Sequence, residues 1–170
     1  GPPYIVMNYW VSVAVTMIWI VGVCNAVNLI DGLDGLAVGV SSIASMSLLA
    51  LTLISENANV AILTAAVAGA GFGFLPYNFN PAKIFMGDTG ALFLGYILAC
   101  ISVQGFLKLS AILSFAIPIL VLGLPIFDTL FAIVRRVLTG RSPMSPDRGH
   151  LHHRLLDMGF SQKQTVAILY

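Results

Sequence analysis

The sequence predicts an all-α fold, a polytopic bundle of membrane-spanning helices. Hydrophobic residues make up 58% of the 170 residues and charged residues only 9%, whereas soluble domains carry about a quarter charged residues. The apolar residues form runs close to the roughly 20 residues that a helix needs to cross a bilayer. The net charge of +1 gives no reason to expect a nucleic-acid partner.

We expect about five complete spans and the start of a sixth, in one membrane domain covering residues 1–170. The five spans are residues 4–24, 36–53, 58–75, 91–106 and 111–137. Pro118 and Pro125 should kink the fifth. Ser161 followed by Gln164 is a capping-box pattern, which marks the start of the sixth. A short amphipathic helix over residues 149–158, closed by Gly159, should precede it.

Three loops are expected on one side of the membrane, because successive spans alternate in direction. They cover about residues 25–35, 76–90 and 135–163. Seven of the eight basic residues lie in them: Lys83, Arg135, Arg136, Arg141, Arg148, Arg154 and Lys163. Only Lys108 falls on the other side. The positive-inside rule therefore predicts that these loops are cytoplasmic.

The first loop holds carboxamides and carboxylates at every third position: Asn25, Asn28, Asp31 and Asp34. In a continuous helix the first and last would point in opposite directions. Gly32 and Gly35 suggest that the helix breaks here and lets the four converge. Oxygen ligands of this kind suit Mg²⁺ or Mn²⁺. The alternative is a polar loop that caps two spans.

The second cluster, residues 78–90, places Asp88 between two glycines at the start of a span. Asp88 is a candidate metal ligand, and helix capping is the alternative. Lys83 could hold a phosphate as a point charge. Phe85 could stack on a base, although a Phe at the membrane edge is commoner.

The third loop gathers imidazole and guanidinium groups that together favour an anion site. These residues are Arg148, His150, His152, His153 and Arg154, with Asp147 just before them. Arg can clamp a phosphate with two parallel hydrogen bonds. A zinc site and a basic loop that meets anionic lipid are the alternatives.

Asp128 lies inside the fifth expected span, where an acid is a functional hypothesis by default. It precedes Arg135 by seven residues, two helical turns on the same face and about 10 Å along the axis. A direct pair would need the Arg side chain to reach back. A structural role near the cytoplasmic rim is favoured over a catalytic one.

Taken together, the three motifs resemble the polyprenyl-phosphate N-acetylhexosamine-1-phosphate transferase family, glycosyltransferase family 4. The motifs are Asn-x-x-Asn-x-x-Asp-Gly-x-Asp-Gly-Leu-Ala from Asn25, Phe-Met-Gly-Asp-Thr-Gly from Phe85, and His-Leu-His-His-Arg from His150. The resemblance implies transfer of N-acetylglucosamine 1-phosphate from UDP-N-acetylglucosamine to undecaprenyl or another polyprenyl phosphate, which yields polyprenyl-diphospho-N-acetylglucosamine and UMP. This would be the first membrane step of a cell-envelope glycan.

The resemblance also implies residue roles, with Mg²⁺ or Mn²⁺ as cofactor. Asp88 and Asn28 would bind the metal. Asp31, Asp34, His152 and His153 would form the catalytic centre, with Asp34 orienting the phosphates or the acceptor. The substrate-binding residues would be Asn25, Asn28, Asp31, Asn78, Lys83, Phe85, His150, His152, His153 and Arg154.

Family members also carry paired aspartates in an earlier loop, and no Asp-Asp occurs in this chain. We therefore expect this chain to be the C-terminal half of a roughly ten-span enzyme and to be inactive alone. The enzyme is expected in the bacterial inner membrane, and whether it forms a homodimer is left open. The histidine pattern favours UDP-N-acetylglucosamine over UDP-N-acetylmuramoyl-pentapeptide, the donor in peptidoglycan synthesis. A secondary transporter is the main rival class, favoured only by Asp128. A structural membrane subunit would leave the Asp and His loops unexplained.

Overall fold

The computed structural model describes residues 8–105, 119–140, 142 and 149–170. All regular structure in these ranges is α-helical, which confirms the predicted fold class. The helices are α1 (Tyr9–Ile30), α2 (Leu36–Ile54), α3 (Ala58–Asn78), α4 (Gly87–Gly105), α6 (Gly123–Leu138), α7 (Leu151–Asp157) and α8 (Gln162–Leu169). Lys108, Pro118, Arg141, Asp147 and Arg148 lie outside the described residues.

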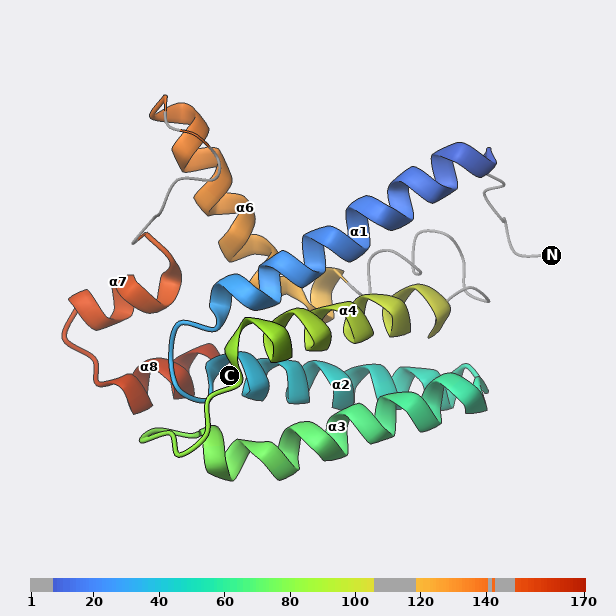
Figure 1. Cartoon of the computed structure of the whole chain (residues 1–170), viewed down its shortest axis with the longest axis horizontal. Helices are drawn as coiled ribbons and strands as arrows, with labels where there is room; N and C mark the ends of the chain where they lie inside the picture. Colours follow the sequence, from blue (N-terminus) through green and yellow to red (C-terminus); the bar gives the residue numbers. More distant parts are fainter. Residues whose placement is uncertain (1–7, 106–118, 141, 143–148) are drawn as a thin grey trace.

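Four of these helices, α1 to α4, are long and apolar enough to cross a membrane. They lie lengthwise beside one another, with α1 packed on α4 and α2 on α3 (Figure 1). Gly95 lets α4 approach α1 closely, because a Cβ at this position would stand 2.8 Å from the Cα of Cys24. Small residues at helix contacts are typical of membrane bundles, where packing replaces the hydrophobic effect between helices.

Apolar side chains cover the outside of the bundle as well as its inside. Val27, Leu48 and Leu98 are buried in the core between the helices. Ile18 and Phe93, by contrast, are 74% and 64% exposed. Outward-facing apolar side chains of this size are expected where the surrounding solvent is lipid.

Several helices are longer than the sequence predicted. The first span was expected to end at Cys24, but α1 continues to Ile30, so Asn25 and Asn28 are helical. Val23, Ala26, Val27 and Ile30 form a continuous buried stripe, and this packing carries the helix past the polar residues.

The third helix also runs further than expected, to Asn78 and through Pro76. The last turn closes because the Phe79 N–H donates to the Leu75 carbonyl at 2.7 Å. The fourth helix begins at Gly87, so Asp88 lies in its first turn. The second span agrees with α2 within one residue.

Only the C-terminal part of the expected fifth span is described. There the helical structure is interrupted at Leu122, before α6 begins. Pro125 lies in the first turn of α6, and its missing N–H cannot bond to the carbonyl four residues earlier. The interruption agrees with the kink predicted at Pro125, whereas Pro118 lies outside the described residues.

The predicted short helix and the start of the next helix are confirmed as α7 and α8. Gly159 has a positive φ of 93° just after α7. The Ser161 side chain accepts from Gln164 N–H, and Gln164 accepts from Ser161 N–H, so the capping box is complete.

The segments that carry the predicted motifs meet at one end of the bundle. This end holds the turn at residues 31–35, the loop at residues 79–86, and α7 with α8, whereas the turn at residues 55–57 lies at the other end (Figure 1). The alternation of spans therefore brings the three loops together, as the sequence predicted.

Candidate functional site

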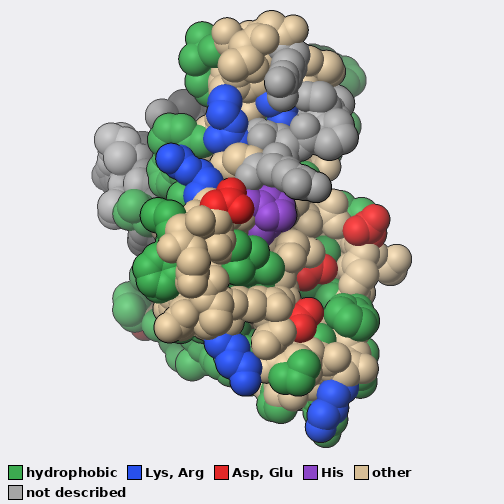
Figure 2. Space-filling model, turned by 90° about the vertical axis from the view of Figure 1, so that its left-hand side faces the viewer, with side chains coloured by type: hydrophobic (Ala, Val, Ile, Leu, Met, Phe, Trp, Pro, Cys, Tyr) green, Lys and Arg blue, Asp and Glu red, His purple; other side chains and the backbone are tan. Residues whose placement is uncertain are grey.

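Acidic side chains and a histidine patch lie across the loop end, with Lys and Arg side chains above and below them in this view (Figure 2). Three segments build this surface. We name them the aspartate turn (residues 31–35), the second loop (residues 79–86) and the histidine segment (residues 149–154). The last turn of α1 and the first turn of α4 complete it.

Asn28 and Asp88 touch each other, although 60 residues separate them. The amide Nδ2 of Asn28 donates to Oδ1 of Asp88 at 3.2 Å. The contact forms because α1 ends where α4 begins and the two helices pack along their length. The two residues predicted to bind metal are therefore adjacent in space.

Asp31 follows one turn after Asn28, at the C-terminal end of α1. Its pKa is raised, first by burial and then by the negative charges of Asp88 and Asp34. Asp88 and Asp34 lie close enough to repel the charge of an ionised Asp31. A bound cation would relieve this repulsion, so the site suits a divalent ion.

The donor set also limits how a metal would be held. In the ranges that the structure describes, no three His, Cys, Asp or Glu side chains are grouped to hold a metal ion. An ion at Asp88 would therefore need the Asn28 amide oxygen, water or substrate oxygens as further ligands. Mg²⁺ is commonly held in this way, by one or two carboxylates together with water and substrate phosphates.

Asp34 points toward the second loop. Its Oδ2 accepts from the Asn80 side chain and from the Ala82 backbone N–H, both at 3.0 Å. The same Asn80 nitrogen donates to Gln162 Oε1 on α8 at 2.8 Å. Asp34 therefore links the aspartate turn to the second loop, a positioning contact that the sequence did not reveal. Its predicted role toward phosphates stays a prediction.

Asn78 was predicted to contact substrate; that role stays a prediction, and the structure shows contacts of this side chain within the protein. It is buried, and its Oδ1 accepts from the Gly35 N–H at 3.1 Å. Its Nδ2 donates to the Ile84 carbonyl at 3.0 Å. Both ends of the carboxamide therefore join the aspartate turn to the second loop.

Asn25 lies on α1, one helical turn before Asn28. Its side chain is exposed and donates to the Val21 carbonyl of its own helix at 2.7 Å. The predicted helix break is found, since α1 ends at Ile30 just before Gly32. The convergence of Asn25 with the other three residues, and its role toward substrate, stay predictions.

Lys83 and Phe85 lie on the surface of the second loop. Both are exposed, Phe85 by 75%. They are placed where they could meet a ligand at the loop end, and their predicted roles stay predictions.

The histidine segment is anchored on Asp128 of α6. Nδ1 of His150 lies 2.8 Å from Asp128 Oδ2, and the Leu151 N–H donates to Asp128 Oδ1 at 2.9 Å. Arg135, considered above as a partner of Asp128, instead donates from Nη1 to the Gly149 carbonyl at 3.0 Å. Asp128 and Arg135 both lie on α6, so this helix holds the histidine segment through one acidic and one basic side chain.

The three imidazoles form a group. His152 lies parallel to His150, with ring centroids 5.8 Å apart, and 4.3 Å from the ring of His153. The pKa of His152 is lowered to about 4, chiefly by burial and then by His153 and His150, with Asp128 opposing the shift. His152 is therefore neutral near pH 7. The positive charge expected of an anion site must come from other side chains, such as the exposed Arg154.

The fold and site together define a polytopic helical membrane protein with an acidic centre and a histidine cluster at one end of its bundle. Residues 2–106 match the family described as Glycosyl transferase family 4, and the chain belongs to this family.

Curated relatives agree with this assignment. The chain is 47% identical to the probable undecaprenyl-phosphate N-acetylglucosaminyl 1-phosphate transferase of Bacillus subtilis, over 95% of this chain and 45% of that protein. It is 40% identical to the decaprenyl-phosphate N-acetylglucosaminephosphotransferase of Mycolicibacterium smegmatis, over 100% of this chain and 47% of that protein. It is 36% identical to the phospho-N-acetylmuramoyl-pentapeptide-transferase of Desulforudis audaxviator, over 96% of this chain and 47% of that protein. The chain thus spans about half the length of these relatives.

Proposed function

We propose that the full-length polypeptide carrying this chain transfers N-acetylglucosamine 1-phosphate from UDP-N-acetylglucosamine to a polyprenyl phosphate. The acceptor phosphate oxygen bonds to the sugar-linked phosphorus. The bond from that phosphorus to the bridging oxygen breaks, and UMP leaves with this oxygen. The observation that carries the proposal is the contact between Asn28 and Asp88 beside Asp31, in a chain whose relatives are named as N-acetylglucosaminyl 1-phosphate transferases.

Mg²⁺ or Mn²⁺, when bound, would neutralise the diphosphate and the leaving nucleotide. Asp88 and Asn28 would hold the ion. Asp31, close to Asp88, would face the reacting phosphates, and Asp34 would keep the aspartate turn in place through its bonds to the second loop.

The exposed side chains around this centre would hold the donor. Lys83 and Arg154 offer positive charge to phosphates, and Phe85 offers a ring face to uracil. His152 lies against the aspartate turn, with His153 beside it, and both rings would contact the diphosphate or sugar. In this role His152 donates or accepts a hydrogen bond as a neutral ring.

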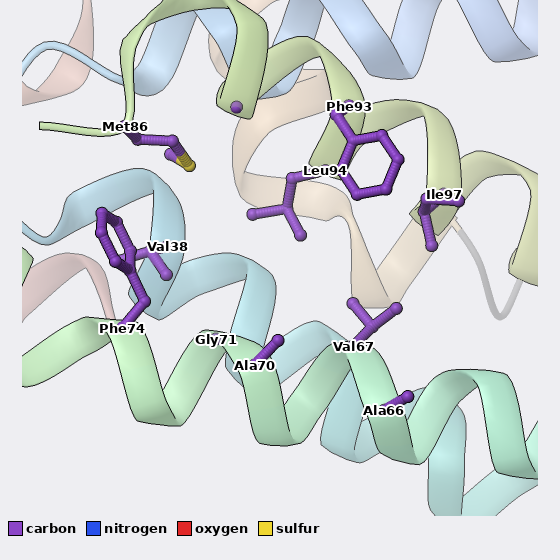
Figure 3. Close-up of a pocket in the computed structure, with 11 residues that line it drawn as sticks. Val38, Ala66, Val67, Ala70, Gly71, Phe74, Met86, Phe93, Leu94 and Ile97 are labelled. Carbon is purple, nitrogen blue, oxygen red and sulfur yellow. The ribbon is translucent and has the colours of Figure 1, made fainter.

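An apolar groove next to Asp88 suits the acceptor lipid. It lies between α2, α3 and α4, has a volume of about 350 Å³, and is lined almost wholly by apolar side chains (Figure 3). Met86 and Gly90 line it close to Asp88 in the chain, while Val67 and Ile97 line it further along the helices. A polyprenyl chain in this groove would leave its phosphate near the acidic centre.

The orientation in the membrane follows from charge. The loop end carries Lys83, Arg154 and Lys163, and the positive-inside rule would place it in the cytoplasm, where nucleotide sugars are found. A bacterial inner membrane fits the named relatives. A homodimer and the identity of the glycan stay predictions.

The test uses the full-length polypeptide in detergent with Mg²⁺, undecaprenyl phosphate and UDP-N-acetylglucosamine. UMP release should fall at least about 100-fold in Asp88→Asn and on chelation, as expected when a charge-stabilising group is lost. Glu56→Gln, an exposed acid at the opposite end of the bundle, is the matched control and should release UMP at the wild-type rate. Full activity in Asp88→Asn would remove the metal assignment.

A second arm offers UDP-N-acetylmuramoyl-pentapeptide as donor, because one matched relative is named for that reaction. UMP release only with this donor would replace the proposed sugar while keeping the reaction type. A transporter loses its one supporting feature, since the Asp128 carboxylate is bonded to the histidine segment.

A further inference from the structure

Asp128 lies in a mostly apolar pocket beneath the loop end. It is only 5% exposed. A small cavity bounded by Ile30, Leu36, Leu124 and Leu169 adjoins it and also touches His152. A carboxylate in such surroundings is costly unless its oxygens are bonded. Both oxygens are bonded, and both bonds go to the histidine segment.

The two bonds fix different parts of that segment. Oδ1 accepts from the Leu151 backbone N–H, which fixes the start of α7 relative to α6. Oδ2 faces Nδ1 of His150. An ionised carboxylate can only accept, so Nδ1 carries the proton and the other ring nitrogen of a neutral His150 is left as an acceptor.

The fixed ring of His150 lies against the ring of His152. Its imidazole lies parallel to that of His152, at an interplanar angle of 8°. His152 in turn packs against the aspartate turn, where a Cβ on Gly32 would stand only 2.6 Å from its Nε2. A continuous chain of contacts therefore runs from Asp128, through His150 and His152, to the turn that holds Asp31.

We propose that Asp128 is a positioning residue that sets the ring state of His150 and thereby places His152 against the aspartate turn. Asp128 itself is buried, and both of its carboxylate oxygens bond to the histidine segment rather than to the aspartate turn. The proposal rests on the function proposed above, because the placement matters for catalysis only if the histidine segment meets the donor.

Asp128→Asn tests this directly. The amide keeps the shape of the side chain and can still accept from Leu151. Facing His150 with its NH₂ group, however, it would favour the tautomer protonated on Nε2. The expected result is a fall in kcat of about 10- to 100-fold, the scale seen when a reacting group is displaced by about 1 Å. The KM for UDP-N-acetylglucosamine should change less than kcat, because the side chains exposed at the loop end remain.

The decisive readout is the ring state of His150, measured by ¹⁵N NMR of histidine-labelled full-length protein. We expect the Nδ1–H form in wild type and its loss in Asp128→Asn, with shifted signals from His152. In the double variant Asp128→Asn, His150→Gln, kcat should be no lower than in the more affected single variant, because both changes break the same contact.

Thr129→Val is the matched control on α6. Within the described residues its Oγ1 has no hydrogen-bond partner, so the substitution keeps the volume and loses no bond. Its kcat and its NMR signals should match wild type.

The outcomes separate this proposal from the proposed function. If wild type released no UMP, the proposed function would fail, and the NMR signals would still decide whether Asp128 sets the ring state. Unchanged His150 and His152 signals in Asp128→Asn, or independent additive losses in the double variant, would overturn the positioning role.

Discussion

The imidazole of His152 lies directly on the backbone of Gly32. A Cβ at position 32 would stand 2.6 Å from Nε2 and 3.0 Å from Cε1 of that ring. This contact joins the third motif of the chain to the first, across 120 residues of sequence. It explains a glycine that the sequence suggested only as a helix breaker.

Gly32→Ala should therefore displace His152 rather than strain the backbone. The added methyl group overfills the contact, which typically costs about 1–3 kcal/mol. We expect a lower unfolding midpoint in detergent and a fall in UMP release by the full-length polypeptide. Gly73→Ala is the matched control, since a Cβ there meets nothing within 4 Å. Equal behaviour of the two variants would show that the contact is unimportant.

The lowered pKa of His152 predicts a pH-dependent stability. In the unfolded chain the ring takes up a proton near pH 6.5, whereas in the fold it does so near pH 4. The unfolded state thus binds more protons between these values. This contribution to the free energy of unfolding is complete above pH 6.5 and is lost as pH falls toward 4, by up to about 3 kcal/mol.

The measurement compares unfolding midpoints of wild type and His152→Gln at pH 7.5 and pH 5. The wild type should lose more stability on acidification than the variant. His153→Gln, which leaves the buried ring in place, should keep most of the wild-type fall. An identical pH response in wild type and His152→Gln would contradict the assignment to this ring.

Asn78→Ala should destabilise the loop end without removing a charge. It leaves the buried Gly35 N–H without its partner, at about 1–3 kcal/mol, and also frees the partly buried Ile84 carbonyl. Asn25→Ala removes an exposed carboxamide whose bond lies within its own helix turn, and its unfolding midpoint should stay near wild type. Thermal unfolding in detergent checks both. A midpoint for Asn78→Ala equal to that of Asn25→Ala would argue against the buried link.

Ala70→Trp tests the groove between α2, α3 and α4. Ala70 lines the groove (Figure 3), so the indole would occupy the space proposed for the polyprenyl chain. The KM for undecaprenyl phosphate should rise several-fold, while the KM for UDP-N-acetylglucosamine stays unchanged. Ala65→Trp places the same bulk on an exposed position of α3 outside the groove lining. Unaltered lipid kinetics in Ala70→Trp would move the acceptor chain elsewhere.

Much of the architecture was predictable because a membrane helix is recognised from a local run of apolar residues. The runs that predicted the second and third spans begin at Leu36 and Ala58, where α2 and α3 begin. The capping box at Ser161 is local as well, since Gln164 lies one turn away. The far end of α1 was missed because a buried stripe carries the helix past its polar residues. The far end of α3 was missed because a backbone bond from Phe79 to Leu75 closes its last turn.

Partners within the site could not be predicted in the same way. The sequence offered Arg135 as the nearest base on the same helix face as Asp128, but the carboxylate bonds to His150, 22 residues away. Asn78 and Asn25 have the same side chain, and only burial distinguishes the link between loops from the exposed amide.

The sequence alone thus determined that the chain is a membrane helical bundle with its polar motifs at one end, because hydropathy and the alternation of spans are local properties. Tertiary structure decided which of those polar groups meet. Asn28 reaches Asp88 only because α1 and α4 pack along their length. His152 reaches Gly32 only because α6 holds the histidine segment over the aspartate turn. Such contacts depend on where helix ends lie in space, which spacing along the chain does not encode.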